Sequence, residues 1–342
     1  TQATSALFDA NAYGVSGSTV MIADSIRGFF ASGATINPTI DIAGTLIVDN
    51  GYSGKVVTLT KVAGSGTLKF DCIYTHNIQN LVDWNGSLEY VKSVSSSSAS
   101  TASGTISSIS SGMGTVKFGY KPSTAPNFDN DWSGTFAINW THSSGALNLN
   151  DYGTSKSTVR IDTDITGGYL GNGGNSAADK IHVVLPRVNL QANMSLTSGW
   201  ANANAGGENK TTFVEMTGSG NFVTWETGYS DPYVSYYGIT TLSNYTGTIT
   251  VNNRSALDIG TVKVDAGPEA GAPYVSVVCN EAYTDGNSTV HNAGYMRYLE
   301  NTTLAVNGIS QSAKLAYATI NTVSGLYKAV ASYNTSYYAT MT

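Results

Sequence analysis

Hydrophobic and polar residues alternate along many short stretches of the chain, and several of these stretches begin at a glycine. Leu68 and Phe70 are separated by single polar residues in one stretch, and Val116 and Phe118 in another. A period of two places every second side chain on the same face of a β-strand. The pattern therefore predicts an all-β protein built from many short strands, each with one buried face.

Two short phrases recur at the starts of these strands. The first is Gly-x-Gly followed by an alternating run, at residues 64–70, 112–118 and 218–224. The second is an aromatic residue, a small polar residue and Gly before such a run, at residues 83–90, 131–138 and 244–251, with a fourth copy at 51–57. The first phrase precedes the second three times, with steps of twenty residues from Gly66 to Gly86 and from Gly114 to Gly134, and twenty-seven from Gly220 to Gly247.

Repeats of this length favour a solenoid. A unit of roughly 20 residues buries one strand face but cannot close a core alone, so neighbouring units must stack. Glycine at each corner supplies the close approach or positive φ that a tight turn requires. The alternative is a set of antiparallel β-sandwich domains, whose strands also recur at short spacing with turn residues between them.

The phrases at residues 64–68 and 244–251 resemble the strand repeats of autotransporter passengers and related bacterial surface β-helix proteins. The resemblance covers residues 43–140 and 218–265. It implies a right-handed parallel β-helix, export from the cell, and a role in adhesion or surface coating.

The repeats divide the chain into three parts. Residues 1–42 do not repeat and are expected to form an N-terminal cap or strand segment, and residues 43–309 form the repeated body. Residues 310–342 are expected to form a C-terminal cap or a segment that pairs with another subunit. Caps are expected because the end rungs of a solenoid expose unpaired backbone and apolar side chains.

Composition narrows the class of partner. Only 12% of the residues are charged, whereas 41% are hydrophobic, and the net charge is −6. A chain without clustered Lys or Arg does not suit nucleic acid, and no apolar run is long enough to span a membrane. Cys72 and Cys279 lie many rungs apart in a solenoid, which favours two buried thiols over a disulfide.

Candidate metal-binding and catalytic residues are few. None of the four histidines, His76, His142, His182 and His291, has a spacing typical of a metal site, so each is expected to be structural or exposed. Two pairs of carboxylates are better placed to bind Ca²⁺ or to act as acid and base. These pairs are Asp129 with Asp131 and Asp162 with Asp164. Asp131 opens an aromatic phrase, so the alternative is a hydrogen bond to the backbone of its turn.

Aromatic residues between 225 and 237 are the candidate ligand-binding group. Their rings are suited to stacking on sugars, although cross-strand packing is the alternative for tyrosines in a β-protein. The candidates are Trp225, Tyr229, Tyr233, Tyr236 and Tyr237.

Nine Asn-x-Ser/Thr sequons mark candidate glycosylation sites. They lie at Asn85, Asn139, Asn193, Asn209, Asn244, Asn253, Asn287, Asn301 and Asn334.

These observations predict a secreted or cell-surface structural protein without catalytic activity. It is expected to act by adhesion, as a homo-oligomer or filament or by binding a glycan, with no cofactor unless the carboxylate pairs hold Ca²⁺. Two alternatives remain open. One is a β-helix polysaccharide lyase or hydrolase, and the other is an adhesin like a viral tail spike.

Overall fold

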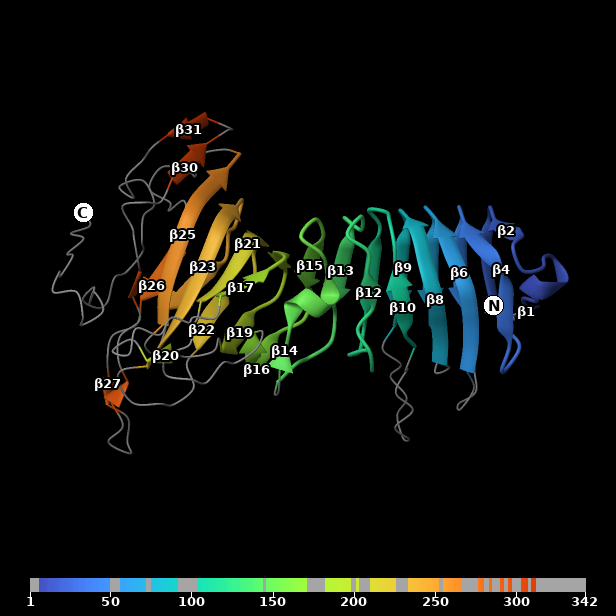
Figure 1. Cartoon of the computed structure of the whole chain (residues 1–342), viewed down its shortest axis with the longest axis horizontal. Coiled ribbons are helices and arrows are strands. Elements are labelled where there is room, and N and C mark those ends of the chain that lie inside the picture. The colour runs from blue at the N-terminus through green and yellow to red at the C-terminus, as the bar shows by residue number, and fades with distance from the viewer. Residues whose placement is uncertain are drawn as a thin grey trace, which may run out of the picture. The chain divides into compact units, whose positions relative to one another are not determined.

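A computed structural model describes residues 6–49, 56–71, 75–91, 104–143, 146–170, 182–197, 201–202, 210–225, 233–251 and 255–265, and short strands between 276 and 311. The chain forms two compact units. Unit 1 contains residues 1–140 and 151–160, and unit 2 contains residues 141–150 and 161–342. Strands dominate both units, as Figure 1 shows.

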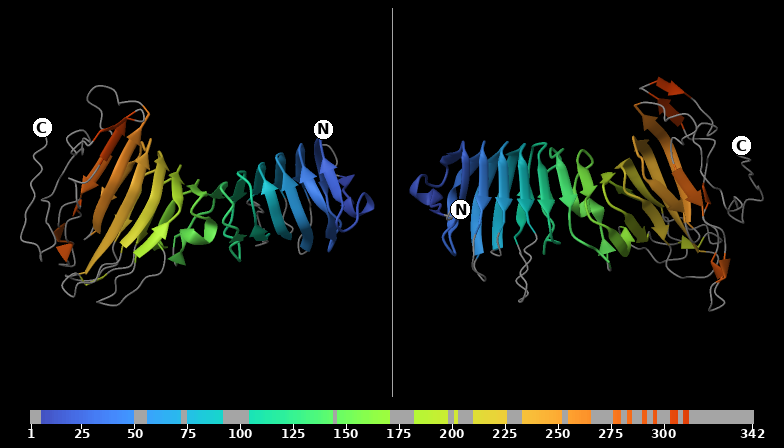
Figure 2. Two further views of the ribbon diagram at one scale, coloured as in Figure 1. Left: turned by 45° about the horizontal axis from the view of Figure 1, so that its top comes forward. Right: turned by 180° about the vertical axis from the view of Figure 1, so that it is seen from behind.

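Unit 1 consists of two parallel sheets, and the chain passes from one to the other in every rung (Figures 1 and 2). The first sheet contains β2 (Thr19–Ile22), β4 (Thr35–Ile42), β6 (Val56–Gly64), β8 (Thr75–Trp84), β10 (Ile106–Ile109) and β12 (Asn127–Phe128). The second contains β1 (Ala6–Leu7), β3 (Ser25–Phe29), β5 (Thr45–Val48), β7 (Thr67–Phe70), β9 (Ser87–Tyr90), β11 (Thr115–Phe118) and β13 (Thr135–Ile138). This alternation confirms the predicted parallel β-solenoid and excludes the antiparallel sandwich.

The register of the second sheet measures the length of each rung. Leu46, Leu68, Leu88, Val116 and Phe136 occupy one column of directly paired residues. Successive members of this column are 22, 20, 28 and 20 residues apart in sequence. The strands stay in register from rung to rung, so the extra residues of the longer rungs lie in the segments that connect the strands.

The core of unit 1 lies between the two sheets and contains a stack of aromatic rings. Tyr90 stacks on Phe70 with a centroid distance of 4.7 Å and on Phe118 at 4.5 Å. Phe118 continues the stack to Phe136 at 5.5 Å, and all four side chains are buried. The period-two pattern therefore correctly predicted which side chains face the interior.

Glycine is required at the corner that precedes the second sheet. A Cβ atom built on Gly86 would lie 2.0 Å from the carbonyl oxygen of Gly66, on the previous rung, and the same contact joins Gly66 to Gly44. The first glycine of the Gly-x-Gly phrase has a different role, because Gly64 has a φ of +120° and Gly112 one of +119°. The first glycine of the phrase is therefore required by its positive φ, and the second by the close approach of the previous rung.

Unit 2 also contains two sets of parallel strands. One sheet contains β14 (Ala146–Leu147), β16 (Ile165–Leu170), β19 (Met194–Thr197), β22 (Phe222–Trp225), β24 (Thr248–Val251) and β26 (Ser276–Cys279). The other set contains β17 (His182–Leu185), β18 (Arg187–Leu190), β21 (Lys210–Gly218), β23 (Tyr233–Ser243), β25 (Ser255–Val264), β29 (Tyr295–Met296) and β30 (Thr303–Val306). Paired residues in the first sheet are 23 residues apart between β14 and β16 and 27–29 apart from β16 onward, as for Met194 with Phe222.

The remaining elements are short. β15 (Thr158–Ile161) crosses the boundary between the units in sequence. Antiparallel pairings join β20 (Ala201–Asn202) to β23, β27 (Tyr283–Thr284) to β28 (Val290–His291), and β30 to β31 (Ile309–Gln311). The described residues also include the 3₁₀ turns η1 (Ala10–Ala12) and η2 (Leu149–Tyr152). Among the residues described, no helix is long and apolar enough to cross a membrane.

Candidate functional site

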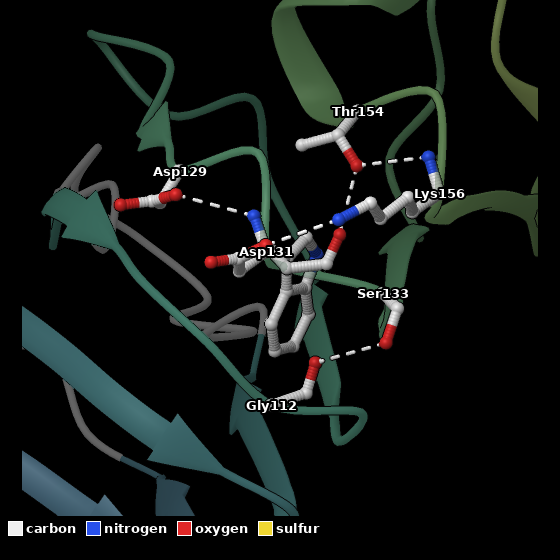
Figure 3. Close-up of polar contacts among 7 residues, drawn as sticks. Gly112, Asp129, Asp131, Ser133, Thr154 and Lys156 are labelled. Atoms are coloured by element: carbon white, nitrogen blue, oxygen red, sulfur yellow. Dashed lines mark hydrogen bonds and ion pairs between the residues drawn. The ribbon is translucent and has the colours of Figure 1, made fainter.

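The first predicted carboxylate pair, Asp129 and Asp131, lies at an exposed corner of unit 1 (Figure 3). Asp129 Oδ1 accepts a hydrogen bond of 3.1 Å from the backbone N–H of Asp131, so the turn contact that the sequence offered for the Asp131 carboxylate is made by Asp129. Asp131 Oδ1 forms an ion pair of 3.0 Å with Nζ of Lys156. Thr154 ties the same corner together, since its hydroxyl donates to the carbonyl oxygen of Trp132 at 2.8 Å. Each carboxylate therefore has a structural partner.

The second pair, Asp162 and Asp164, lies in unit 2, where Asp164 begins a ladder of side chains. Asp164 Oδ1 accepts a hydrogen bond of 2.9 Å from the backbone N–H of Asn193, on the next rung. Asn193 Oδ1 accepts one of 3.0 Å from Asn221 N–H, and Asn221 Oδ1 accepts one of 3.0 Å from Thr248 N–H. We call Asp164, Asn193 and Asn221 the Asx ladder.

Calcium binding by either aspartate pair stays a prediction. In the part of the chain that the structure describes, no group of three or more His, Cys, Asp or Glu side chains is placed to share a metal ion.

Three sequon asparagines use their side chains to tie rungs together. Asn85 accepts from Met113 N–H at 3.1 Å and donates to the Asp83 carbonyl oxygen at 3.0 Å. Asn244 accepts from Asp265 N–H at 2.9 Å, and Asn193 belongs to the Asx ladder. An Asn followed two residues later by Ser or Thr therefore has a structural use at these corners, whether or not it is glycosylated.

The other six sequons are at the following positions. Asn139 is half-buried just after β13. Asn209, Asn253, Asn287, Asn301 and Asn334 lie outside the described residues. Glycosylation stays a prediction.

Of the predicted aromatic group, Tyr237 lies in the core. Tyr237 is 1% exposed, and its ring packs edge-on against Phe222 at a centroid distance of 5.8 Å, so it cannot present a face to a ligand. Trp225 ends β22, and Tyr233 and Tyr236 belong to β23. Tyr229 lies outside the described residues. Ligand binding by these four residues stays a prediction.

The buried titratable groups serve packing. His76 is fully buried and stacks on Phe70 at 4.8 Å, which fits the structural role predicted for it. Burial, with a smaller contribution from the charge of Asp151, raises the pKa of Tyr152 to about 12. Burial also raises the pKa of Tyr245, whose hydroxyl donates to the Gly220 carbonyl oxygen at 2.7 Å.

The predicted state of the two cysteines stays open. Cys279 ends β26, whereas Cys72 lies outside the described residues.

One feature of unit 1 was not predicted from the sequence. The first residue of every strand from β3 to β13 in the second sheet is Ser or Thr, and these six residues are in register on its outer face. We call them the hydroxyl column: Ser25, Thr45, Thr67, Ser87, Thr115 and Thr135. The sequence signal that could have revealed it is a glycine directly before the Ser or Thr, which is present at every member except Ser25.

A second column of residues runs beside the hydroxyl column on the same outer face. It consists of Arg27, Ile47, Lys69, Glu89, Lys117 and Ala137, and the last of these is buried. Its charges form three ion pairs with N–O distances of 2.8 Å (Arg27–Asp49), 3.8 Å (Lys69–Asp71) and 3.2 Å (Lys117–Glu89). We call these residues the ion-paired column.

Comparisons with known proteins do not identify a relative. No protein-family model matches the chain, and neither a curated protein nor a solved structure is significantly similar to it.

Proposed function

We propose that this protein is an exported structural or adhesive component of a cell surface, similar in kind to the passengers of autotransporters. It acts by assembling with further copies or by binding a glycan. The observation that carries the proposal is the Asx ladder, in which Asp164, Asn193 and Asn221 each bind the backbone of the next rung. Asp and Asn side chains, which often bind metals or take part in catalysis, here form hydrogen bonds that hold neighbouring rungs together.

The charged residues support the same proposal. Lys117 pairs with Glu89 at 3.2 Å, and Arg187 pairs with Glu215 at 3.2 Å, each between different strands. Arg187 is thus engaged by Glu215, and Asp164 is engaged in the ladder. These contacts suit a rigid scaffold that presents flat outer faces.

The test combines electron microscopy with surface binding. The full chain is purified, its sedimentation is measured over a range of concentrations, and it is imaged in negative stain and incubated with polysaccharide particles and bacterial cells. We expect concentration-dependent assembly into rods or filaments, or retention on at least one surface. A chain that stays monomeric and is retained on no surface would overturn the proposal.

Two further outcomes would also replace it. The release of reducing or unsaturated sugar ends from the polysaccharides would indicate an enzyme. A detergent-resistant trimer would indicate an adhesin of the tail-spike kind.

A further inference from the structure

The hydroxyl column of unit 1 has the geometry of a binding surface for an extended polymer. We propose that it binds a chain of an uncharged, β-linked polysaccharide along the direction in which the rungs stack. The inference rests on the proposed function, and it specifies both the surface and the class of glycan.

The hydroxyl groups of the column are available to a ligand. Ser25 and Ser87 are exposed, and the four threonines are half-buried. Within the part of the chain that the structure describes, none of the six hydroxyls makes a hydrogen bond to another protein group. Each of them can therefore donate one hydrogen bond and accept others.

The other sheet of unit 1 shows the contrasting case. Its outer face is also polar, but several of its side chains bond to one another or to neighbouring backbone. The Thr60 hydroxyl donates to the Ile36 carbonyl oxygen at 2.8 Å, and Asn80 Nδ2 donates to the Thr60 carbonyl oxygen at 3.1 Å. Ser108 Oγ donates to Asn80 Oδ1 at 2.9 Å. Several polar groups of this face are therefore engaged by protein partners, whereas in the described part of the chain none of the six hydroxyls of the column is.

The column is evenly spaced and rigid. Neighbouring strands of a sheet lie about 4.8 Å apart, so the column repeats a hydroxyl at this interval over six rungs. The strand that carries each hydroxyl is anchored by a buried residue, as Leu68 anchors Thr67 and Val116 anchors Thr115. A ligand bound there needs its own regular series of donors and acceptors, and the hydroxyls of an extended sugar chain provide one. A preformed surface also keeps the ordering cost of binding low.

The charge of the face selects a neutral polymer. Each cation of the ion-paired column, Arg27, Lys69 and Lys117, already has a carboxylate within 4 Å. The face therefore carries little uncompensated positive charge for a polyanion to neutralise. Its carboxylates and cations can still exchange hydrogen bonds with sugar hydroxyls at the side of the column.

The test removes hydroxyls without changing the shape of the strands. The triple variant T67V/T115V/T135V replaces three hydroxyls of the column with methyl groups, and valine keeps the β-branched shape. The matched control is T35V/T58V, which removes two hydroxyls from register-paired residues on the other sheet of the same unit. Circular dichroism and the urea midpoint establish that both variants fold.

Binding is measured by retention on cellulose and chitin particles, and by affinity electrophoresis through soluble xyloglucan, with alginate as the polyanionic comparison. We expect the wild type to bind a neutral glycan more tightly than alginate. The triple variant should bind at least about tenfold more weakly, since each lost hydrogen bond contributes on the order of 1 kcal/mol, and the control should bind as the wild type does.

Three outcomes would overturn the inference. Equal binding by the triple variant and the wild type would place the glycan elsewhere and leave the proposed function standing. Preferential binding to alginate would contradict the charge argument. Failure of the wild type to bind any neutral glycan would remove the inference, while assembly seen by electron microscopy would still support the proposed function.

Discussion

Asn193 Oδ1 accepts a hydrogen bond of 3.0 Å from the backbone N–H of Asn221, one rung further along unit 2. Both side chains occupy the position just before a strand, β19 for Asn193 and β22 for Asn221. The side chain of one rung therefore satisfies a backbone donor of the next, at a corner where the regular pairing of strands has not yet begun. Asp164 makes the same contact with Asn193, so the oxygen of either a carboxylate or an amide can accept the hydrogen bond at this position.

Asn193→Ala should lower the free energy of unfolding by about 1 kcal/mol, because it removes the acceptor for Asn221 N–H. Asn193→Asp is the matched control, since it keeps the Oδ1 acceptor and places at residue 193 the residue type that unit 2 already uses at Asp164. Urea unfolding of both variants provides the comparison. If the aspartate variant loses as much stability as the alanine variant, the ladder contact is not what stabilises this corner.

Gly86→Ala should destabilise unit 1 by about 3 kcal/mol or prevent folding, because the new Cβ would lie 2.0 Å from the Gly66 carbonyl oxygen. Gly33→Ala is the comparison, because it introduces backbone strain without a steric clash. Gly33 has a φ of +75° and nothing within 4 Å of the position a Cβ would take, so its substitution should cost only about 1–2 kcal/mol. The urea midpoints of the two variants measure the difference, and equal losses would mean that crowding at the corner is unimportant.

The sequence predicted the rungs of unit 1 well, because local steric rules determine them. The step of twenty residues from Gly66 to Gly86 matches the register of Thr67 with Ser87. The rungs of unit 2 were harder to recognise, because the corner position before Gly220 is Ala192 rather than glycine. The carbonyl oxygen of Ala192 lies 1.9 Å from the Cβ position of Gly220.

The candidate site was less predictable, because register places residues side by side that are distant in sequence. Thr67 and Thr115 belong to one column although 48 residues separate them, and the 28-residue rung between Ser87 and Thr115 breaks the regular period. The pairing of Asp131 with Lys156 depends likewise on the fold. Tyr237 shows the opposite error, since the clustering of tyrosines in sequence suggested a surface role for a ring that lies in the core.

Phe118→Ala should cost about 3–5 kcal/mol, because it leaves a cavity in the aromatic stack between Tyr90 and Phe136. Phe118→Leu is the control that refills most of the volume without a ring, and it should cost less than half as much. Urea unfolding distinguishes the two. A leucine variant as unstable as the alanine variant would mean that the ring stacking, rather than the filled volume, supplies most of the stability.

Tyr152 should make unit 1 less stable at alkaline pH. Its side chain is buried, and its pKa in the folded protein is about 12, above the ordinary value of 10.0. Because the folded pKa is the higher one, the stabilising contribution of the neutral phenol is fully present below pH 10 and is lost as the pH rises through 12. Tyr152→Phe keeps the ring that packs on Phe136 at 5.2 Å but cannot ionise. The urea midpoint of the wild type should therefore fall more steeply between pH 10 and 12 than that of the phenylalanine variant. The two should run parallel between pH 7 and 9, and parallel curves through the alkaline range as well would show that Tyr152 does not cause the loss.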